Sequence, residues 1–317
     1  MYHGFTESRT KGGFENVENS HLDVDKFEKQ IKFLKKYYNS ISLPYLLQLL
    51  KSKKKLPKNP VILTFDDGYE SNYKYAFPIL KKYNIPASIF ITTNFVNDRE
   101  ILWMDRIEYA LNKTQLESVR LKILGETITV NEMTESAKIK LLKKVKVLIK
   151  NGPQDKIEEN VNNIIESLKV NSFDPASLPD IYSPLNWQQI NEMLDSTLIS
   201  IGSHTCSHVI LSKCTESRLS EELVKSKKII ESSIGAICDL FCYPNGQKAD
   251  FNENTKKYLK ESGYQCGLTT LQAFNTNNTD LFKLNRLYVS NKDNFQDFVL
   301  SLSGLRLIRQ KLKLKVD

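Results

Sequence analysis

Two adjacent aspartates, Asp66 and Asp67, are the residues of this sequence best suited to chemistry. They directly follow the apolar run VILTF at 61–65, and Gly68 comes next. Neighbouring side chains of an extended strand point to opposite faces, so two like charges in succession indicate either a solvated turn or a functional use. Gly68 allows a tight turn in which the backbone and a substrate approach closely. In such a pair, one carboxylate can bind a metal ion while the other accepts a proton from water.

Two histidines add further metal-ligand candidates. The sequence contains four histidines, and His204 and His208 share the short loop GSHTCSH at 202–208. Two imidazoles with three residues between them can face one ion. Imidazole nitrogen together with a carboxylate oxygen suits zinc, with cobalt, nickel or iron as alternatives. Two histidines and one aspartate leave coordination positions open, as in a catalytic site, so we expect a divalent metal cofactor, with zinc as the first candidate.

The positions of these motifs along the chain favour a site over simpler interpretations. A DDG turn alone is typical of a surface turn, and a lone HxxxH is typical of a helix face. Here both motifs follow predicted strands, as does YPNG at 243–246. The carboxyl ends of parallel strands meet at one edge, where α/β proteins place their sites. We therefore expect the three motifs to converge.

The elements that would position these motifs alternate between helices and short apolar strands. Helical spacing of apolar residues predicts helices at 24–38, 43–51, 72–83, 186–195, 216–234, 251–262 and 293–314. Strands are predicted within 61–65, 85–96, 198–203, 240–244, 264–270 and 282–289. Parallel strands joined by covering helices form a doubly wound sheet or a barrel, and both place the site at the strand ends.

The stretch 97–183 departs from this alternation. A predicted hairpin around Gly125 separates helical patterns at 103–113 and 134–170, the second broken at 151–153. Proline and serine indicate a closing loop at 171–184. We interpret 97–183 as a largely helical insertion within a single domain of residues 1–317.

The amino-acid composition limits the classes of protein to which this chain can belong. Of the 317 residues, 40% are hydrophobic and 26% are charged, which is ordinary for a globular α/β protein. The formal net charge is +8, but the lysines are spread over predicted helices, so we expect solvated helix faces and no nucleic-acid partner. Five cysteines without a CxxC pair are expected to stay reduced. No apolar run has the length of a signal peptide or a transmembrane segment, so we expect a cytoplasmic chain, with truncation of an upstream segment left open.

Three motifs in succession carry a family resemblance. TFDDG at 64–68, SHTCSH at 203–208 and FCYPNG at 241–246 resemble the successive motifs of the polysaccharide deacetylase family, also called carbohydrate esterase family four or the nodulation-type deacetylase domain. The resemblance covers nearly the whole chain outside the predicted insertion. It implies an α/β fold, a distorted (β/α) barrel of about seven strands, and hydrolysis of an N- or O-acetyl group on a sugar.

The resemblance also implies roles for the motif residues. Asp66 corresponds to the general base, and Asp67 corresponds to a metal ligand beside His204 and His208. The backbone N–H of Tyr243 would help to hold the oxyanion, a role that requires no particular side chain.

The chain departs from the family's fullest pattern in two places. Many members take the proton for the departing amine from a histidine near the C-terminus, but no histidine follows His208 here. Many members also place an arginine just before the proline of the third motif to orient the base, and LFCYP at 240–244 has none. His3 and Arg286 are candidates for the vacant acid or for substrate contacts. Return of the proton by Asp66 itself is a third option.

Three further residues are weaker candidates for contacts with a sugar. Trp187 could stack on a sugar ring, although packing of its helix is the simpler interpretation. Trp103 and Asp105 begin the predicted insertion and could form a wall of the substrate groove.

The resulting hypothesis is a metal-dependent hydrolase that removes an acetyl group from an N-acetylated sugar in surface-polysaccharide or glycan-precursor metabolism. The expected substrate is an N-acetylated glycan or a lipid- or nucleotide-linked sugar. Two alternatives remain open: a hydrolase of another amide, such as a formyl or cyclic amide, on the same fold, and a catalytically idle carbohydrate-binding protein.

Overall fold

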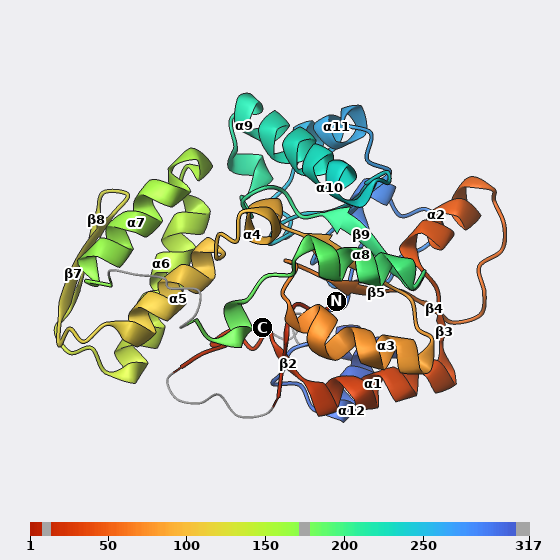
Figure 1. The fold of residues 1–317 in the computed structure, drawn as a ribbon, viewed down its shortest axis with the longest axis horizontal. Coiled ribbons are helices and arrows are strands. Elements are labelled where there is room, and N and C mark those ends of the chain that lie inside the picture. The colour runs from red at the N-terminus through yellow and green to blue at the C-terminus, as the bar shows by residue number, and fades with distance from the viewer. Residues whose placement is uncertain (8–13, 171–177, 309–317) are drawn as a thin grey trace.

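The computed structural model describes residues 1–7, 14–170 and 178–308. A five-stranded sheet lies at its centre, with the strand order β11-β10-β9-β6-β5 (Figure 1). All neighbouring strands run parallel. The strands are short and almost completely buried, as expected for a parallel sheet covered by helices: β5 (Leu63–Phe65), β6 (Ala87–Ile91), β9 (Ile199–Ser203), β10 (Leu240–Cys242) and β11 (Cys266–Leu268).

Extended segments at the two edges of the sheet bring it close to a closed barrel. Tyr2 forms a parallel bridge with β5, and Leu284 forms one with β11. The two segments then meet each other, because the N–H of Val289 donates to the carbonyl of Met1 at 3.2 Å. The five strands and the two edge segments form the curled, distorted barrel that the sequence predicted.

The strand predicted at 282–289 is wrong in its detail. Leu281–Lys283 forms a turn of 3-10 helix (η6), and Leu284 makes a single bridge. The N–H of Arg286 then donates to the carbonyl of Leu271, which lies beyond the end of β11. The segment therefore leaves the regular ladder at the position where Arg286 turns its side chain toward the barrel interior.

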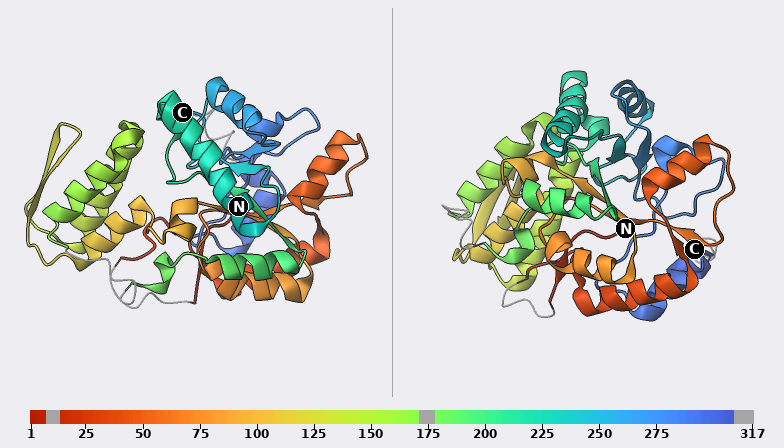
Figure 2. Two further views of the ribbon diagram at one scale, coloured as in Figure 1. Left: turned by 45° about the horizontal axis from the view of Figure 1, so that its top comes forward. Right: turned by 45° about the vertical axis from the view of Figure 1, so that its right-hand side comes forward.

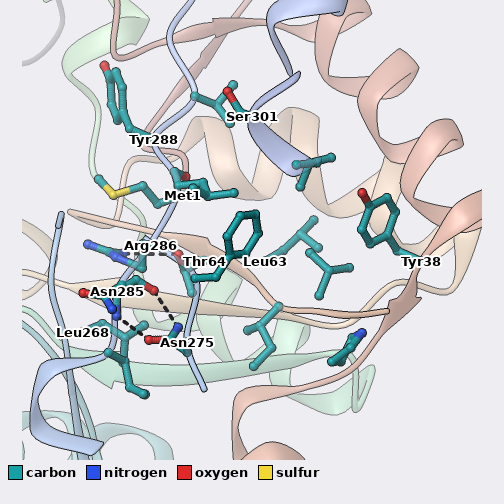
Figure 3. Close-up of a pocket in the computed structure, with 18 of the residues that line it drawn as sticks. Met1, Tyr38, Leu63, Thr64, Leu268, Asn275, Asn285, Arg286, Tyr288 and Ser301 are labelled. Carbon is teal, nitrogen blue, oxygen red and sulfur yellow. Dashed lines mark hydrogen bonds between the residues drawn. The ribbon is translucent and has the colours of Figure 1, made fainter. Parts of the chain in front are cut away.

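An apolar cavity lies between the two edge segments and the helices outside them (Figure 3). Met1, Thr64 and Arg286 lie together on one side of it. Most of the remaining lining is aliphatic or aromatic and includes Leu34, Tyr38, Leu43, Leu46, Leu63, Leu268, Leu287 and Phe298. The two edges of the sheet therefore meet through a few hydrogen bonds beside a cavity.

Helices flank the strands in the predicted order. Three of them begin with a capping box, in which the side chain of Asn186, Asn252 or Asn294 accepts the N–H of the third helical residue, and the backbone N–H of the same Asn donates to the side chain of that residue. The helices are α1 (Val24–Tyr37), α2 (Leu43–Lys51), α3 (Phe77–Tyr83), α8 (Trp187–Asp195), α9 (Glu216–Ser220), α10 (Ser226–Ile234), α11 (Glu253–Glu261) and α12 (Phe295–Leu302). Single π-helical turns, Asn72–Ala76 (η1) and Glu221–Lys225 (η5), precede α3 and α10.

Two predicted elements are shorter than expected. The strand predicted at 85–96 ends at Ile91, and α4 (Thr93–Asn97) follows because the N–H groups of Thr93 and Asn94 turn toward carbonyls of the histidine loop. The helix predicted at 293–314 is interrupted after Leu302 by a turn in which Gly304 has φ +80°. Residues 309–314 of that prediction lie outside the described residues.

The stretch after α4 forms a helical body beside the barrel, and Figure 2 shows it there from two directions. It contains α5 (Trp103–Lys113), the antiparallel hairpin of β7 (Val119–Ile123) and β8 (Glu126–Val130), α6 (Glu135–Asn151), η2 (Gln154–Lys156) and α7 (Ile157–Ser167). These elements match the predicted hairpin and the predicted break at 151–153. The interpretation of 97–183 as an insertion stays a prediction, and 171–177 lies outside the described residues.

Several short elements complete the chain. Two further parallel pairs join β1 (Phe5–Thr6) to β2 (Leu22–Asp23) and β3 (Asn39–Ser40) to β4 (Pro60–Val61). Single 3-10 turns are η3 (Asp180–Tyr182) and η4 (Leu211–Lys213). Among the described residues, no helix has the length and apolar character needed to cross a membrane.

Candidate active site

Side chains from three strand ends meet in one cavity. Asp66 and Asp67 follow β5, and His204 and His208 follow β9. All four line a cavity that Asn245, from the loop after β10, also lines. The structure therefore brings together the motifs that the sequence placed at the carboxyl ends of parallel strands.

Asp67, His204 and His208 are arranged to hold a cation. Oδ1 of Asp67 lies 3.5 Å from Nε2 of His204 and 3.4 Å from Nε2 of His208. Two ligands bound at about 2.0 Å to a tetrahedral ion are about 3.3 Å apart. Oδ1 of Asp67 is buried and has no hydrogen-bond partner among the described residues, although buried polar atoms are normally satisfied. The three side chains therefore fit a divalent cation, and their nitrogen and oxygen donors suit zinc, cobalt, nickel or iron.

The protonation of these side chains also suits metal binding. Nδ1 of His204 lies 2.8 Å from the carbonyl oxygen of Cys242, so a neutral ring donates Nδ1–H there and keeps the Nε2 lone pair for a ligand. Burial lowers the pKa of His204 to about 4, which keeps the ring neutral. Burial alone would raise the pKa of Asp67, but the close approach of His208 and the charges of His3 and His204 lower it to about 2.

The backbone of the two ligand loops adopts conformations that side chains usually avoid. Asp67 has φ 78°, and in the histidine loop Thr205 has φ 69° and His208 has φ 55°. Gly68 has φ 94°, and a Cβ there would lie 3.1 Å from side-chain atoms of Ile91 and Val96. Such conformations persist where the surrounding structure holds them, and they cluster at functional sites. Gly68 is therefore required both for its φ and for the packing around it.

Glu222 holds the histidine loop, a role that the sequence did not suggest. This carboxylate is fully buried, and its Oε2 accepts the N–H groups of Cys206 at 2.7 Å and Ser207 at 3.1 Å. Arg218 places Nη2 2.8 Å from its Oε1. The loop between the two histidines is therefore anchored to the π-helical turn η5 through one ionised side chain.

Arg286 forms a bidentate ion pair with Asp66. Its Nη1 and Nη2 each lie 2.7 Å from a carboxylate oxygen of Asp66, and its Nε donates to the carbonyl of Thr269 at 2.7 Å. Burial would raise the pKa of Asp66, but the charge and the hydrogen bonds of Arg286 outweigh burial and hold this pKa below its ordinary value. Arg286 therefore contacts the carboxylate that is expected to act as the base. The third motif has no arginine for this contact, and Arg286, from a different segment of the chain, makes it instead.

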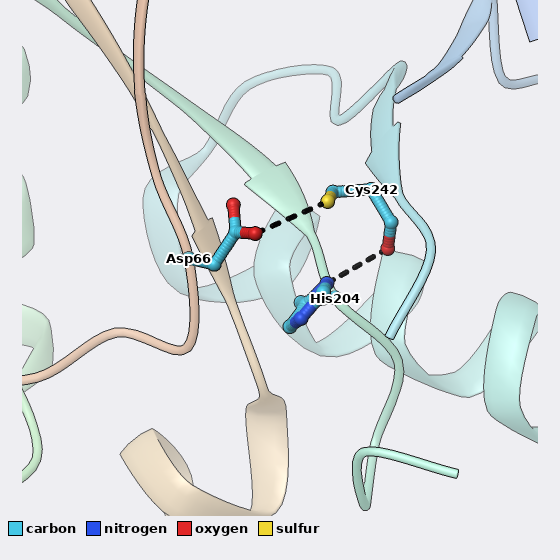
Figure 4. Close-up of side chains that lie close together, drawn as sticks. All are labelled: Asp66, His204 and Cys242. Atoms are coloured by element: carbon cyan, nitrogen blue, oxygen red, sulfur yellow. Dashed lines mark hydrogen bonds between the residues drawn. The ribbon is translucent and has the colours of Figure 1, made fainter. Parts of the chain in front are cut away.

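A second cluster, Asp66, His204 and Cys242, also has potential ligand atoms within 4.8 Å of one another (Figure 4). Sγ of Cys242 lies 3.6 Å from Oδ2 of Asp66 and 3.0 Å from Nη2 of Arg286. Burial raises the pKa of Cys242 well above its ordinary value, so the thiol stays protonated. A guanidinium in contact with both the carboxylate and the sulfur repels a cation, so this cluster is not a second metal site.

The backbone N–H of Tyr243 does not fit the predicted oxyanion role. It already donates to the carbonyl of Leu268 at 3.0 Å, within the pairing of β10 and β11. Pro244 has no N–H to offer. Asn245 is the next residue, and it lines the cavity with a left-handed φ of 61°. The structure therefore argues against Tyr243 as the donor, because its N–H still belongs to the ladder of the sheet.

His3 and Trp187 lie in different surroundings. His3 lines the cavity, and its Nδ1 is buried without a hydrogen-bond partner among the described residues. Trp187 packs against the core, and its Nε1 donates to Asn97 at 3.1 Å, away from the side chains that line the cavity. The packing interpretation of Trp187 therefore accounts for its position.

The helical body supplies one wall of the cavity. Asp105 from α5 lines the cavity, as do Lys146 and Lys150 from α6. Lys150 donates from Nζ to Oδ1 of Asn245 at 2.9 Å, and Nε1 of Trp103 lies 3.4 Å from the carbonyl oxygen of His208. The predicted groove wall is therefore in contact with two of the three site loops.

A curled parallel barrel with a buried Asp-His-His cluster at its strand ends defines a class of α/β proteins with a candidate metal centre. The polysaccharide deacetylase family model matches residues 53–267, and the chain belongs to this family.

Relatives and solved structures agree with this family. The chain is 24% identical over 265 residues to YxkH of Bacillus subtilis (strain 168), covering 83% of this chain and 64% of that protein. It is 32% identical over 127 residues to the poly-β-1,6-N-acetyl-D-glucosamine N-deacetylase of Staphylococcus aureus (strain MSSA476), covering 40% and 44% of the two chains. The chain thus spans less than two thirds of the length of either relative.

Among solved structures, the Streptococcus pyogenes deacetylase PplD in complex with acetate has a similar fold. Its TM-score is 0.61 at 18% identity, and the match covers 95% of this chain and 96% of PplD. The de-N-acetylase of Aggregatibacter actinomycetemcomitans has a TM-score of 0.59 at 19% identity and covers 95% and 97% of the two chains. At 18% and 19% sequence identity, the similarity to these two structures establishes the fold alone.

Proposed function

We propose that this chain is a metal-dependent hydrolase that removes the acetyl group from an N-acetylated sugar. The observation that carries the proposal is the presence, in one cavity, of an Asp-His-His ligand set and a separate carboxylate, Asp66, held by Arg286. Family membership supports an acetylated sugar as substrate. The N-acetylglucosamine polymer in the name of the Staphylococcus aureus relative favours that sugar, as a polymer or as a lipid- or nucleotide-linked unit.

The two aspartates have separate tasks in this proposal. A divalent cation held by Asp67, His204 and His208 would supply Lewis-acid chemistry, which polarises a carbonyl and lowers the pKa of water. Asp66 accepts the proton of the attacking water, and its low pKa keeps it ionised for that step. Arg286 fixes both oxygens of Asp66, so the carboxylate faces the cavity in one orientation.

The negative charge that develops on the acetyl oxygen requires a donor from the protein. We assign this task to the backbone of the loop after β10 at Asn245, because this residue lines the cavity and Tyr243 uses its N–H in the sheet. Backbone donors that are already oriented stabilise such an oxyanion without reorganisation. Lys150 bonds to the Asn245 side chain and holds this loop in place.

Acetate release tests the proposed function. Purified protein is supplied with Zn²⁺, Co²⁺, Ni²⁺ or Fe²⁺ and incubated with N-acetylglucosamine oligomers and with lipid-linked N-acetylglucosamine, with and without a chelator. We expect chelator-sensitive release, and Asp66→Asn should lower kcat about 10²-fold or more while retaining the metal. Asp67→Asn should lose the metal itself. Release that persists after removal of metal, or that is unchanged in Asp66→Asn, would contradict the proposal.

A further inference from the structure

The departing amine of an amide must gain a proton, and the site described so far contains no assigned donor. No histidine follows His208 in the sequence. Asp66 is paired with Arg286, and this pairing favours the ionised carboxylate. The wall formed by the helical body contains carboxyl groups that the mechanism has not yet used.

Together with Glu18 from the segment before α1, this wall places three carboxyl groups and two ammonium groups along the cavity. Asp105 and Glu108 lie one turn apart on α5, are only 8% and 5% exposed, and line the same cavity as Asp66 and the metal-binding residues. Glu18 also lines the cavity and lies 3.2 Å from Nζ of Lys146. Lys150 is the other lysine of the wall, and it bonds to a site loop. Asp105 and Glu108 are both buried and lie one turn apart, so ionisation of one disfavours ionisation of the other.

Hydrogen bonding indicates which of these two carboxyls keeps a proton. Oε1 of Glu108 accepts two bonds, from the backbone N–H of Asn16 at 2.8 Å and from the hydroxyl of Tyr182 at 3.0 Å. Burial raises the pKa of Glu108, but these two donors and the charge of Lys146 act against burial and favour the ionised form. Oδ2 of Asp105 accepts one bond, from the hydroxyl of Tyr69 at 2.8 Å. The proton therefore resides preferentially on Asp105.

The electrostatic surroundings of Asp105 agree with this assignment. Glu108 on its own helix, Asp67 and Tyr69 after β5, Tyr182 of η3 and Lys146 of α6 face it. Burial and the charge of Glu108 raise the pKa of Asp105 to about 8, against the opposing effects of Lys146 and the Tyr69 hydrogen bond. A general acid is most effective when its pKa lies near the working pH.

We propose that Asp105 donates the proton to the departing amine, a step that rests on the proposed deacetylase function. The carbon–nitrogen bond of the tetrahedral adduct breaks, its electron pair stays on nitrogen, and the proton of the Asp105 carboxyl moves to that nitrogen. Acetic acid and a neutral amine result, and the acid then releases its proton to solvent as acetate. The Asp105 carboxylate accepts the hydrogen bond of Tyr69 and regains its proton from solvent, while Asp66 releases to solvent the proton that it took from water.

A comparison of two substrates separates proton donation from a structural role. Amide hydrolysis needs a proton on the leaving nitrogen, whereas 4-nitrophenyl acetate releases a phenolate that departs without one. Asp105→Asn is isosteric and still accepts the bond from Tyr69. We expect this variant to lose about 10²-fold or more of its acetate release from N-acetylglucosamine oligomers. We expect its hydrolysis of 4-nitrophenyl acetate to stay within about twofold of wild type, because only the amide needs the acid.

Matched variants and a pH profile make the result decisive. Asp180→Asn changes an exposed aspartate of the chain in the same way and should leave both rates unchanged. Metal content and melting temperature are measured for each variant. Equal loss of both activities in Asp105→Asn would overturn the proposal, and so would an amide-selective loss in His3→Gln with Asp105→Asn unaffected.

The pH profile covers the case in which the ester is not turned over or the variant does not fold. The wild-type kcat for the amide should then fall as the pH rises through the pKa of Asp105, which burial and the charge of Glu108 raise above its ordinary value. A profile that stays flat to pH 9.5 would overturn the proposal. A wild-type protein that binds metal but turns over neither substrate would instead overturn the proposed function itself.

Discussion

At the scale of residues, the two aspartates differ mainly in what neutralises them. Asp67 faces two imidazole nitrogens, whereas Asp66 faces a guanidinium that bonds to both of its oxygens. The sequence distinguished the two only through the family resemblance, since adjacent aspartates are chemically identical until the fold surrounds them. The ion pair with Arg286, 220 residues away in sequence, is the feature that separates the proposed base from the proposed ligand.

Substitution of Arg286 by lysine tests this division of roles. Lysine keeps the charge but cannot bond to both oxygens of Asp66, so the carboxylate should lose its fixed orientation. We expect acetate release to fall about tenfold to 10²-fold. We expect the affinity for Zn²⁺, measured by calorimetry, to stay within about twofold of wild type, because among the described residues Arg286 bonds to Thr64, Asp66, Cys242 and Thr269 and to none of the three ligands. Loss of metal together with rate would mean that Arg286 supports the whole centre.

The raised pKa of Asp105 leads to a prediction that can be tested without a substrate. Its pKa in the folded protein, about 8, lies above the ordinary value of about 3.9. Such a group stabilises the fold fully below its ordinary pKa, and this contribution is lost as the pH rises toward 8. The melting temperature of wild type minus that of Asp105→Asn should therefore decrease steadily between pH 5 and pH 8. A difference that is constant over this range would show that Asp105 is ionised throughout.

The limits of prediction from sequence are also clearest at single residues. Asp66, Asp67, His204 and His208 could be predicted because each pair lies within five consecutive positions and follows an apolar strand. The sequence did not reveal that the N–H of Tyr243 is used in the sheet, since β10 continues its pairing through this residue. No local pattern marks Glu222 or Glu108, whose partners come from distant parts of the chain.

At the scale of elements, the histidine loop depends on the turn η5 as much as on β9. Glu222 of η5 binds the two N–H groups between the ligand histidines. The N–H of His208 is held by Oγ1 of Thr205 at 3.0 Å, and that of His204 by the carbonyl of Ile91 at 2.9 Å. The short strand therefore sets where the loop starts, and η5 sets its shape.

Glu222→Gln tests the contribution of this element to metal binding. Glutamine keeps the shape but replaces an ionised acceptor of two backbone N–H groups and of Arg218 with a neutral amide. Loss of a group that orients ligands typically weakens metal affinity 10- to 100-fold, and we expect an increase in the zinc dissociation constant of this order. Glu221→Gln, at the neighbouring and more exposed position, is the matched control and should bind as wild type does. Equal zinc affinities for the two variants would show that Glu222 does not contribute to metal binding.

The elements that the sequence predicted best are those with a long amphipathic period. The helices α1, α2 and α6 match their predicted spans closely, because packing and propensity agree there. The segment at 282–289 has the composition of a strand, but Arg286 must reach Asp66 and its N–H pairs with Leu271. Tertiary contacts therefore override β propensity where the site requires it.

At the scale of the whole molecule, the candidate metal centre is formed by residues from distant parts of the barrel. Its ligands come from the turn after β5 and from the loop after β9, which are separated in the sheet by β6. Arg286 links the edge segment at 284–289 to the same place, and α5 and α6 close the cavity from the helical body. The single domain of residues 1–317 stays a prediction.

This arrangement makes metal binding a property of the folded chain as a whole. The three ligand atoms converge only when β5, β6 and β9 are assembled, so a cation binds the folded state in preference to the unfolded state. Binding at a free concentration about 100 times the dissociation constant stabilises the folded state by about 2.7 kcal/mol. We therefore expect Zn²⁺ to raise the melting temperature of wild type by several degrees and a chelator to reverse the increase. Asp67→Asn should show neither effect, because it removes the carboxylate that joins the two histidines. If the melting temperature of wild type did not respond to Zn²⁺, Co²⁺, Ni²⁺ or Fe²⁺, then Asp67, His204 and His208 would be a buried polar cluster, and the hydrolase proposed here would lose its cofactor.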